Sequence, residues 1–286
     1  MSKVCIVFDR LRSEEKMLQK EASNLGHDTL MLDAKITQVN TDSKKEDFDL
    51  GDVVLERCVS YFRGLHFTSS LEFLDIPVLN KFEVANICGN KMFMTLLLKK
   101  NNIPTPKTYF SFSSDSAAEN LDKVGYPLVI KPIIGSWGRG VMPVKDKDTL
   151  EALVEVREIT DSPHDRIYYL QEMIDRPPRD IRVITIGDEP VAAMYRKSSD
   201  GGFKTNIALG ADPELCEITK EMEDLAVKAS KAMGGGILGI DMMEDDKRGL
   251  VVHEVNNTVE FKGLARVAQR NIPKEMIEFA LNYVRK

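Results

Sequence analysis

The sequence predicts a mixed α/β fold made of three consecutive units. Over about the first eighty residues, apolar strand-like runs (KVCIVFD, DVVLE and IPVLN) alternate with helical segments, which is typical of a small parallel sheet. Two later pairs of apolar runs are separated only by short links, the glycine-rich GSWGRG and the polar DKRG. Such links predict β-hairpins, one in each of the two following units.

Composition excludes several classes of protein. The chain has 286 residues, 43% of them hydrophobic and 29% charged, as expected for a soluble enzyme-sized protein with two or three cores. Its formal net charge of −6 argues against a general nucleic-acid binder, and no apolar run is long enough to span a membrane. Four scattered cysteines predict buried, reduced thiols in a cytoplasmic protein, and four histidines make a histidine-based site a poor expectation.

The first unit is predicted over residues 1–86. It begins with a buried strand, after which Ser13 is expected to cap a helix that carries Glu14 and Glu15 in its first turn and ends near Gly26. Two further strands follow, with a helix between them. Together they predict a parallel layer.

The second unit is predicted over residues 87–174 and the third over residues 175–286. The second begins with a helix from Lys91, which stops ahead of Pro104, and continues as strand, helix, strand, glycine-rich loop, strand, helix and strand. The third contains the strand RDIRVITIG and two long helices, near residues 217–233 and 273–285, with a hairpin between them.

The loop Gly135–Gly140 has the composition of a phosphate-binding loop, because bare backbone lets N–H groups approach an anion closely. A P-loop would end in Gly-Lys-Ser/Thr and lead into a helix, whereas here Lys131 precedes the loop and a strand follows it. We therefore expect a flap between two strands. It carries Trp137, the only tryptophan, which either docks on a neighbouring unit when the flap closes or is packed in every state.

Asp241, Glu254 and Asn256 are predicted to share one face of the second hairpin. If Asp246–Gly249 is a four-residue loop, Asp241 lies opposite Glu254 with the side chains about 5 Å apart, and Asn256 points the same way. Two carboxylates this close require a cation, and Mg²⁺ with a nucleotide phosphate is the common case. The alternative is an ordinary half-exposed strand. By alternation, His253 should point away from this face and be silent for catalysis.

The segment YYLQEMIDRPPRDIRV predicts a strand that ends in Gln171 and Glu172 and passes into a proline-rich link. Such a link can hold an adenine through backbone N–H and C=O groups. Beyond it, Asp180 and Arg182 share a strand face, where Arg182 would clamp a phosphate or acyl phosphate; a surface ion-pair strand is the alternative.

Three more cations lie at the ends of predicted elements. Lys91 begins a helix, and Lys131 and Arg196 end apolar strands. A cation at the end of a buried strand must find an anion or extend into solvent, so solvated side chains are the alternative for each.

The order of these elements resembles that of the ATP-grasp enzymes, and nearly the whole chain is similar to the RimK-like ligases. The similar segments are ERCVS (56–60), CGNK (88–91), KPIIGSWGR (131–139), RDIRV (179–183) and HEVNNTVEFK (253–262). GSWGR and EVNxTxEFK resemble the group that joins α-aminoadipate to the small acidic carrier protein LysW. The glycine and carboxylate pattern alone supports only the superfamily.

The resemblance implies an ATP-grasp fold preceded by a parallel-sheet pre-ATP-grasp domain, with ATP held between the second and third units. The implied nucleotide contacts are Lys91, Lys131, Gly135, Ser136, Trp137, Gly138, Arg139, Gly140, Gln171, Glu172, Ile174, Asp180, Arg196 and Asn206. Asp241, Glu254 and Asn256 would hold Mg²⁺, and Arg182 and Arg196 would act in catalysis. Thr258, Glu260 and Phe261 would contact the substrate.

The implied reaction belongs to lysine biosynthesis: the side-chain carboxylate of the C-terminal Glu of LysW takes the γ-phosphate of ATP, and the amino group of α-aminoadipate attacks the acyl phosphate. Positioning and charge neutralisation would suffice, without a covalent nucleophile. We expect a cytoplasmic homo-oligomer, a dimer or tetramer, with a basic rim for the carrier formed by Arg57, Arg63, Lys197, Lys204 and Arg266.

Other functions stay open at this point. The sister ligases use glutamate in arginine biosynthesis, and one enzyme can serve both pathways, since the two amino acids differ by one methylene. A RimK-type ligase that modifies a ribosomal protein or a folate-like cofactor is a further alternative. A nucleotide-binding regulator is disfavoured by the carboxylate pair and Arg182.

Overall fold

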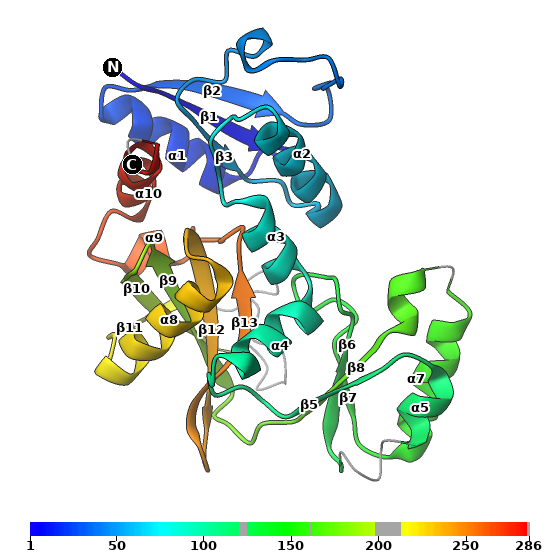
Figure 1. Ribbon diagram of the computed structural model, residues 1–286. Coiled ribbons are helices and arrows are strands. Elements are labelled where there is room, and N and C mark those ends of the chain that lie inside the picture. Colours follow the sequence, from blue (N-terminus) through cyan, green and yellow to red (C-terminus); the bar gives the residue numbers. More distant parts are fainter. Residues whose placement is uncertain (120–124, 161, 198–212, 285–286) are drawn as a thin grey trace.

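The computed structural model describes residues 1–119, 125–160, 162–197 and 213–284, which form three sheets (Figure 1). Within these ranges no helix is long and apolar enough to cross a membrane. All four cysteines are buried and free, as predicted. The mixed α/β class is confirmed.

The first sheet contains β1 (Lys3–Phe8), β2 (Asp28–Asp33), β3 (Val53–Glu56) and β4 (Val78–Leu79) in the order β2-β1-β3-β4, and every pair is parallel, as predicted. Helices α1 (Ser13–Asn24) and α2 (Tyr61–Phe73) accompany it, with a short 3₁₀ turn η1 (Lys45–Asp47). Side chains of β1 alternate between two cores: Val4 and Ile6 pack with Leu18 of α1, whereas Cys5 and Val7 pack with Leu71 of α2.

The start of α1 differs from the prediction. Its N-cap is Arg12, and Ser13 is the first helical residue. The backbone N–H of Arg12 donates to Glu15 Oε2 at 2.8 Å, so the glutamate closes the first turn.

The second sheet is antiparallel, in the order β5-β8-β6-β7. Its strands are β5 (Thr108–Ser111), β6 (Leu128–Lys131), β7 (Met142–Val144) and β8 (Tyr168–Glu172). Helices α5 (Ser114–Glu119) and α7 (Lys147–Glu158) cover one face, and the turn η2 (Pro163–Arg166) precedes β8. The glycine-rich loop joins β6 to β7, as the hairpin prediction requires.

The third sheet is antiparallel, in the order β11-β10-β9-β12-β13. Its strands are β9 (Arg179–Ile186), β10 (Glu189–Lys197), β11 (Pro213–Cys216), β12 (Ile237–Asp245) and β13 (Gly249–Asn256). Three helices pack on one face: α3 (Phe82–Gly89), α4 (Lys91–Lys100) and α8 (Lys220–Met233). Helix α4, expected in the second unit, lies here because Met94 and Leu98 share a core with Val252 and Val255.

The chain then returns to the first sheet. After the short helix α9 (Leu264–Val267), helix α10 (Ile272–Tyr283) packs beside α1 (Figure 1). Met276, Ile277 and Ala280 of α10 join the core that contains Val4 and Ile6. The first and third sheets are thereby joined through one apolar core.

Candidate active site

A cavity of about 800 Å³ lies where the three sheets meet. The first sheet contributes the starts of α1 and α2, the second contributes Lys131 and the glycine-rich loop, and the third contributes polar side chains of β9, β10, β12 and β13. Most of the chemically active side chains selected from the sequence line this cavity.

The hairpin β12–β13 places Asp241 directly opposite Glu254, as predicted, but by a different route. Asp245 pairs with Gly249, so the turn has three residues instead of the expected four. A β-bulge between Asp241 and Met242, with His253 as the extra residue, restores the pairing of Asp241 with Glu254. A bulge places two residues of one strand opposite one residue of the other, which re-aims the side chains beside it.

His253 therefore does not point away from the site, contrary to the expectation from alternation. It lines the cavity together with Glu254, and its Nε2 lies 4.0 Å from Asp180 Oδ2. The bulge ends the strict alternation on which the expectation relied.

Asp241 is held by two arginines. Arg182 donates to both of its oxygens at 2.8 Å, and Arg196 Nη2 lies 3.0 Å from Oδ2. Arg196 also donates to both oxygens of Asp180, at 2.6 and 2.8 Å. Burial by itself would raise the pKa of Asp241, but Arg182 and Arg196 hold that pKa well below its ordinary value. The carboxylate is ionised, and the prediction of a mere surface ion-pair strand does not apply because Arg196, Asp180 and Asp241 are all buried.

Glu254 and Asn256 complete this wall of the cavity. Lys91 Nζ lies 3.1 Å from Glu254 Oε1, and Asn256 Nδ2 donates to Asp241 Oδ2 at 3.3 Å. Lys91 also donates to the carbonyl of Gly135 at 2.7 Å, so one ammonium group joins the hairpin to the glycine-rich loop. Within the described ranges, no group of three or more His, Cys, Asp or Glu side chains is arranged to hold a metal; the predicted magnesium set is two carboxylates and one amide.

Lys131 occupies the opposite wall, at the end of β6. It is buried, donates to Gln171 Oε1 at 2.6 Å, and lies 5.9 Å from the centre of the Tyr169 ring. Gln171 is itself held in place, because its Nε2 donates to Thr108 Oγ1 and to the Tyr169 hydroxyl. Burial lowers the pKa of Lys131 from 10.5 to about 8, against an opposing effect of Glu254. Among the residues that the structure describes, this lysine is buried and has no directly paired anion.

The hinge residues are placed differently from the expectation. Glu172 accepts from the backbone N–H of Lys107 at 2.6 Å and from Arg248 at 2.7 Å, and neither it nor Gln171 nor Ile174 lines the cavity. Arg176, which sequence reasoning overlooked, does line it. The only sequence signal is a cation inside the proline-rich link IDRPP.

The glycine-rich loop reaches across to the third sheet. Trp137 has a φ of 59°, in the left-handed region, between glycines 135 and 138. Its indole Nε1 donates to Glu260 Oε1 at 2.9 Å, and the Arg139 guanidinium lies 5.0 Å from the ring centre. Of residues 135–140, all but Gly140 line the cavity. The tryptophan is therefore docked on the chain segment that follows β13.

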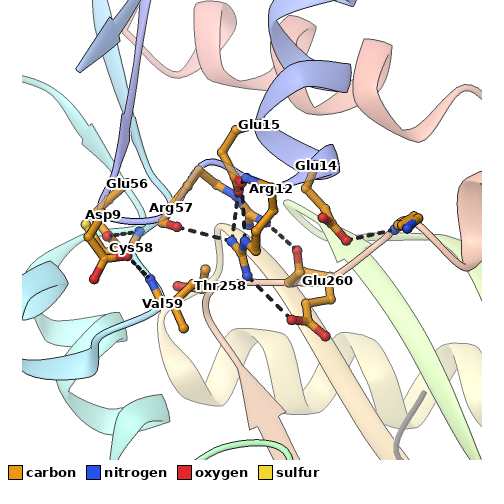
Figure 2. A network of polar contacts seen from close by, with 12 residues as sticks. Asp9, Arg12, Glu14, Glu15, Glu56, Arg57, Cys58, Val59, Thr258 and Glu260 are labelled. Carbon is orange, nitrogen blue, oxygen red and sulfur yellow. Dashed lines mark hydrogen bonds and ion pairs between the residues drawn. The ribbon is translucent and has the colours of Figure 1, made fainter. Parts of the chain in front are cut away.

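The predicted substrate residues divide into two groups. Thr258 and Glu260 line the cavity, whereas Phe261 is fully buried in the core and cannot contact a substrate. Glu260 Oε1 also lies 3.4 Å from Arg12 Nη1 (Figure 2). The carboxylate thus joins the loop after β13 to both the glycine-rich loop and the start of α1.

Arg57 is likewise not part of a basic rim. Its guanidinium is buried, donates to the carbonyl of Val259 at 2.7 Å and lies 3.3 Å from Glu15. It also lies 5.7 Å from the centre of the Phe261 ring. Figure 2 shows Arg57 beside Glu15 and Arg12. Arg57 therefore fixes the first sheet to the chain after β13.

The other predicted rim residues remain at the surface where they are described. Arg63 pairs with Asp9 at 2.6 Å, Lys197 pairs with Glu214, and Arg266 is exposed at the cavity. Asn206 and Lys204 lie outside the described residues.

Comparison with known proteins agrees with this architecture. Residues 88–280 match the RimK-like ATP-grasp domain, and residues 4–87 match the LysX preATP-grasp domain. The α-aminoadipate–LysW ligase LysX of Sulfurisphaera tokodaii is 40% identical over 98% of this chain and 99% of its own length. The glutamate–LysW ligase ArgX of Sulfolobus acidocaldarius is 30% identical over 98% of both.

Solved structures show the same fold. A RimK domain ATP-grasp protein of Sphaerobacter thermophilus has a TM-score of 0.78 at 22% identity, covering 98% of this chain and 99% of its own. The D-alanine–D-alanine ligase of Bacillus anthracis, solved with ATP, has a TM-score of 0.72 at 19% identity, covering 100% and 99%. At these identities the likeness concerns the fold alone.

Proposed function

The chain belongs to the RimK-like ATP-grasp family, and from this premise we propose that it is an ATP-dependent ligase that joins the amino group of α-aminoadipate to the side-chain carboxylate of the C-terminal Glu of LysW. The observation that carries the proposal is the cavity itself. It brings the carboxylates of one hairpin, the buried Arg196, the partly buried Arg182 and a glycine-rich loop to one place. The full-length similarity to LysX selects the substrates.

The reaction divides into two steps. A carboxylate oxygen of LysW attacks the γ-phosphorus of ATP, and ADP leaves; the amine of α-aminoadipate then attacks the acyl carbon, and phosphate leaves as the amide bond forms. Lys91 and Lys131 supply positive charge for the phosphates from two sides of the cavity. Arg182 and Arg196 would stabilise the negative charge that develops on the transferred group.

The hairpin residues also fit Mg²⁺, which when bound would neutralise phosphate oxygens. The donors are hard oxygen ligands from adjacent strands: Asp241 lies opposite Glu254, and the Asn256 amide lies 3.3 Å from Asp241. Arg182, Arg196 and Lys91 balance these carboxylates in the structure described here, so binding the ion requires some of those contacts to loosen.

The glycine-rich loop would keep water from the acyl phosphate, whose hydrolysis wastes ATP. Gly138 and Gly140 have φ angles of 66° and 67°, which a side chain would strain, and Trp137 docks on Glu260, which also lines the cavity. These contacts support a role for the loop as a cover over the reacting groups.

The decisive experiment measures ATP consumption by the purified enzyme with purified LysW and either α-aminoadipate or glutamate. We expect amide formation with α-aminoadipate at a higher kcat/KM than with glutamate, by about ten- to hundredfold, the value of one methylene in a pocket. Higher kcat/KM with glutamate would make the sister activity the main one. No product with either amino acid would contradict the proposal.

The carrier would bind at the mouth of the cavity through exposed cations. Arg266 and Lys262 are exposed there, and Arg63 is exposed on α2; these cations take the place of the buried Arg57 in the sequence-based rim. Exposed charges are screened over about 8 Å at physiological ionic strength, so binding of an acidic partner should weaken as salt rises. A Kd for LysW that stays constant from low to high salt would contradict this surface. The expected homo-oligomer remains a prediction that size-exclusion with light scattering would test.

A further inference from the structure

Glu56 is a buried carboxyl group at the cavity to which the reaction described above gives no role. It is the last residue of β3, it is 6% exposed, and it lines the cavity from the side of the first sheet. The carboxyl ends of parallel strands are a common place for ligands in α/β proteins. A glutamate is rarely buried unless something pairs with it, so Glu56 calls for an explanation.

The polar contacts of the Glu56 carboxyl are neutral. The backbone N–H of Cys58 donates to Oε1 at 2.5 Å, and the Cys58 thiol adds a weaker contact (Figure 2). Arg57, the next residue, is turned toward Glu15 instead, and the residues that the structure describes form no ion pair with Glu56. Burial raises the pKa of Glu56, against the opposing effect of its hydrogen bonds with Cys58.

Helix α2 leaves room for this carboxyl at the cavity wall. Gly64 lies in the second turn of the helix, and a Cβ atom at this position would be 2.7 Å from Glu56 Oε1. Glycine inside a helix is unfavourable relative to alanine. The glycine is nevertheless suited to this position, because any side chain would push the carboxyl away from the place it occupies.

The other carboxylates of the cavity already have positive partners. Glu14 lies in the first turn of α1, where the helix dipole stabilises negative charge, and accepts from the backbone N–H of Lys262 at 3.3 Å. Four more lie within 3.4 Å of a Lys or Arg nitrogen: Asp180, Asp241, Glu254 and Glu260. Among the described residues, Glu56 is therefore the cavity carboxyl that still lacks positive charge.

We propose that Glu56 binds the positively charged amino group of the amino-acid substrate, and so positions the group that attacks the acyl carbon. The inference rests on the proposed function in taking an amino acid as the second substrate. A carboxylate and an ammonium group form a charge-assisted hydrogen bond, and the ammonium supplies the charge that Glu56 lacks. Because α-aminoadipate and glutamate carry the same amino group, Glu56 does not select between them.

The experiment uses pairs of ligands that differ only in the amino group: α-aminoadipate with adipate, and glutamate with glutarate. Each is titrated calorimetrically into the protein saturated with Mg²⁺ and a non-hydrolysable ATP analogue. The wild type should bind α-aminoadipate about ten- to hundredfold more tightly than adipate, the value of one hydrogen bond between charged groups. Glu56→Gln should remove this preference and leave the affinity for adipate unchanged.

Stability separates this role from a structural one. Glu56→Gln keeps an acceptor for the Cys58 N–H and removes a charge from a buried position, so its melting temperature should be the same or higher. Gly64→Ala keeps the charge but displaces the carboxyl, so it should lose part of the preference for the amine. If Glu56→Gln fails to fold, Gly64→Ala decides in its place.

A matched control lies at the same edge of the first sheet. Asp9 directly follows β1 and is also buried, but it does not line the cavity. Its oxygens accept from the backbone N–H groups of Val59 and Ser60 and from Arg63. Asp9→Asn should leave the preference for the amine unchanged.

Three results would overturn the inference: a wild type without preference for the amine in either pair, a preference that persists in Glu56→Gln, or its loss in Glu14→Gln alone. A preference confined to glutamate and lost in Glu56→Gln would refute the proposed substrate and leave this assignment standing. Hydroxylamine should trap the acyl phosphate formed from ATP and LysW equally in the wild type and Glu56→Gln. No hydroxamate in the wild type would refute the proposed ligase, whereas the titrations would still decide the role of Glu56.

Discussion

The two walls of the cavity hold their charges in opposite ways. On the third sheet, Asp180, Asp241, Arg182 and Arg196 form a closed set in which each charge lies within about 3 Å of an opposite one. On the facing side, Lys131 has, among the described residues, the neutral amide of Gln171 as its hydrogen-bond partner. The charges on the third sheet are balanced without any ligand, whereas the charge of Lys131 becomes balanced only when an anion enters.

This difference indicates that the balanced charges of the third sheet contribute to stability, whereas the unbalanced charge on the facing side serves ligand binding. A balanced buried set is costly to break, because removal of one partner strands the others in a low-dielectric interior. An unbalanced set is costly to keep, and its cost is offset when ligand binds. Substitutions in the two walls should therefore change stability in opposite directions.

The largest effect is expected at Arg196. Arg196→Met leaves Asp180 and Asp241 without their shared cation, so the free energy of unfolding should fall by about 3 to 5 kcal/mol in urea denaturation. Asp180→Asn combined with Arg196→Met should recover part of the loss, because one stranded charge is gone. A loss below about 1 kcal/mol would mean that the set is not balanced as described.

Glu254 should matter for turnover more than for folding. It is partly exposed and contacts Lys91, so Glu254→Ala should change stability little. Activity should fall at least a hundredfold while nucleotide still binds weakly, because loss of a metal-holding carboxylate removes several kcal/mol of transition-state stabilisation. Steady-state kinetics against magnesium concentration would measure this, with Glu244→Ala, in the same hairpin but paired with Arg179 outside the cavity lining, as a control. Near-normal turnover would remove Glu254 from the site.

Substitution of Lys131 should change stability in the opposite direction to substitution of Arg196. Its pKa in the folded protein, about 8, lies below the ordinary 10.5, so between these values the folded state binds fewer protons than the unfolded state. Wild-type stability should therefore rise as pH increases through this window, by about 1 to 3 kcal/mol in total. Lys131→Met should lack the rise and be more stable at neutral pH, as urea denaturation at several pH values would show.

Nucleotide binding gives the complementary measurement. A phosphate near Lys131 favours its charged form, so affinity for a non-hydrolysable ATP analogue should fall as pH rises above about 8. Lys131→Met should bind the analogue weakly, with a flatter pH profile. A wild-type profile that is flat up to about pH 10 would show that Lys131 faces no phosphate.

The smallest effect is expected where the glycine-rich loop meets Glu260. Glu260→Gln weakens one charge-assisted hydrogen bond from Trp137, worth about 1 kcal/mol. Emission from Trp137, the only tryptophan, should shift to the red, and quenching by acrylamide should increase. In the wild type, Mg²⁺ with an ATP analogue should shift emission to the blue if the loop closes further. Identical spectra in all states would favour a tryptophan that is packed permanently.

The fold was largely predictable because long apolar runs and hairpin links mark its main strands. Strand β2 (DTLMLD) escaped notice because it is an edge strand that is only half-buried, and β11 has four residues at another edge. Helix α4 was recognised as a helix but assigned to the wrong neighbours, because its apolar face does not reveal which sheet it covers.

The candidate site was harder to predict from the sequence than the fold. The pairing of Asp241 with Glu254 was predicted from a turn one residue too long, and the bulge cancelled the error. The sequence LVVHEVN carries the signal: three apolar residues and then two polar residues interrupt the period of two, which indicates a bulge. No local pattern could place Arg57, because its partners Glu15 and Val259 are distant in sequence and meet only in the folded chain.

The packing of α10 against α1 has a consequence for synthesis on the ribosome. Chains of several domains generally fold one domain after another as they emerge, beginning at the amino terminus. Here Val4 and Ile6 of β1 share a core with Met276 and Ile277, and α10 follows every other described element. One face of the first sheet is therefore covered only in part, by α1, while the rest of the chain is translated, so the part that is made first is among the last to be completed.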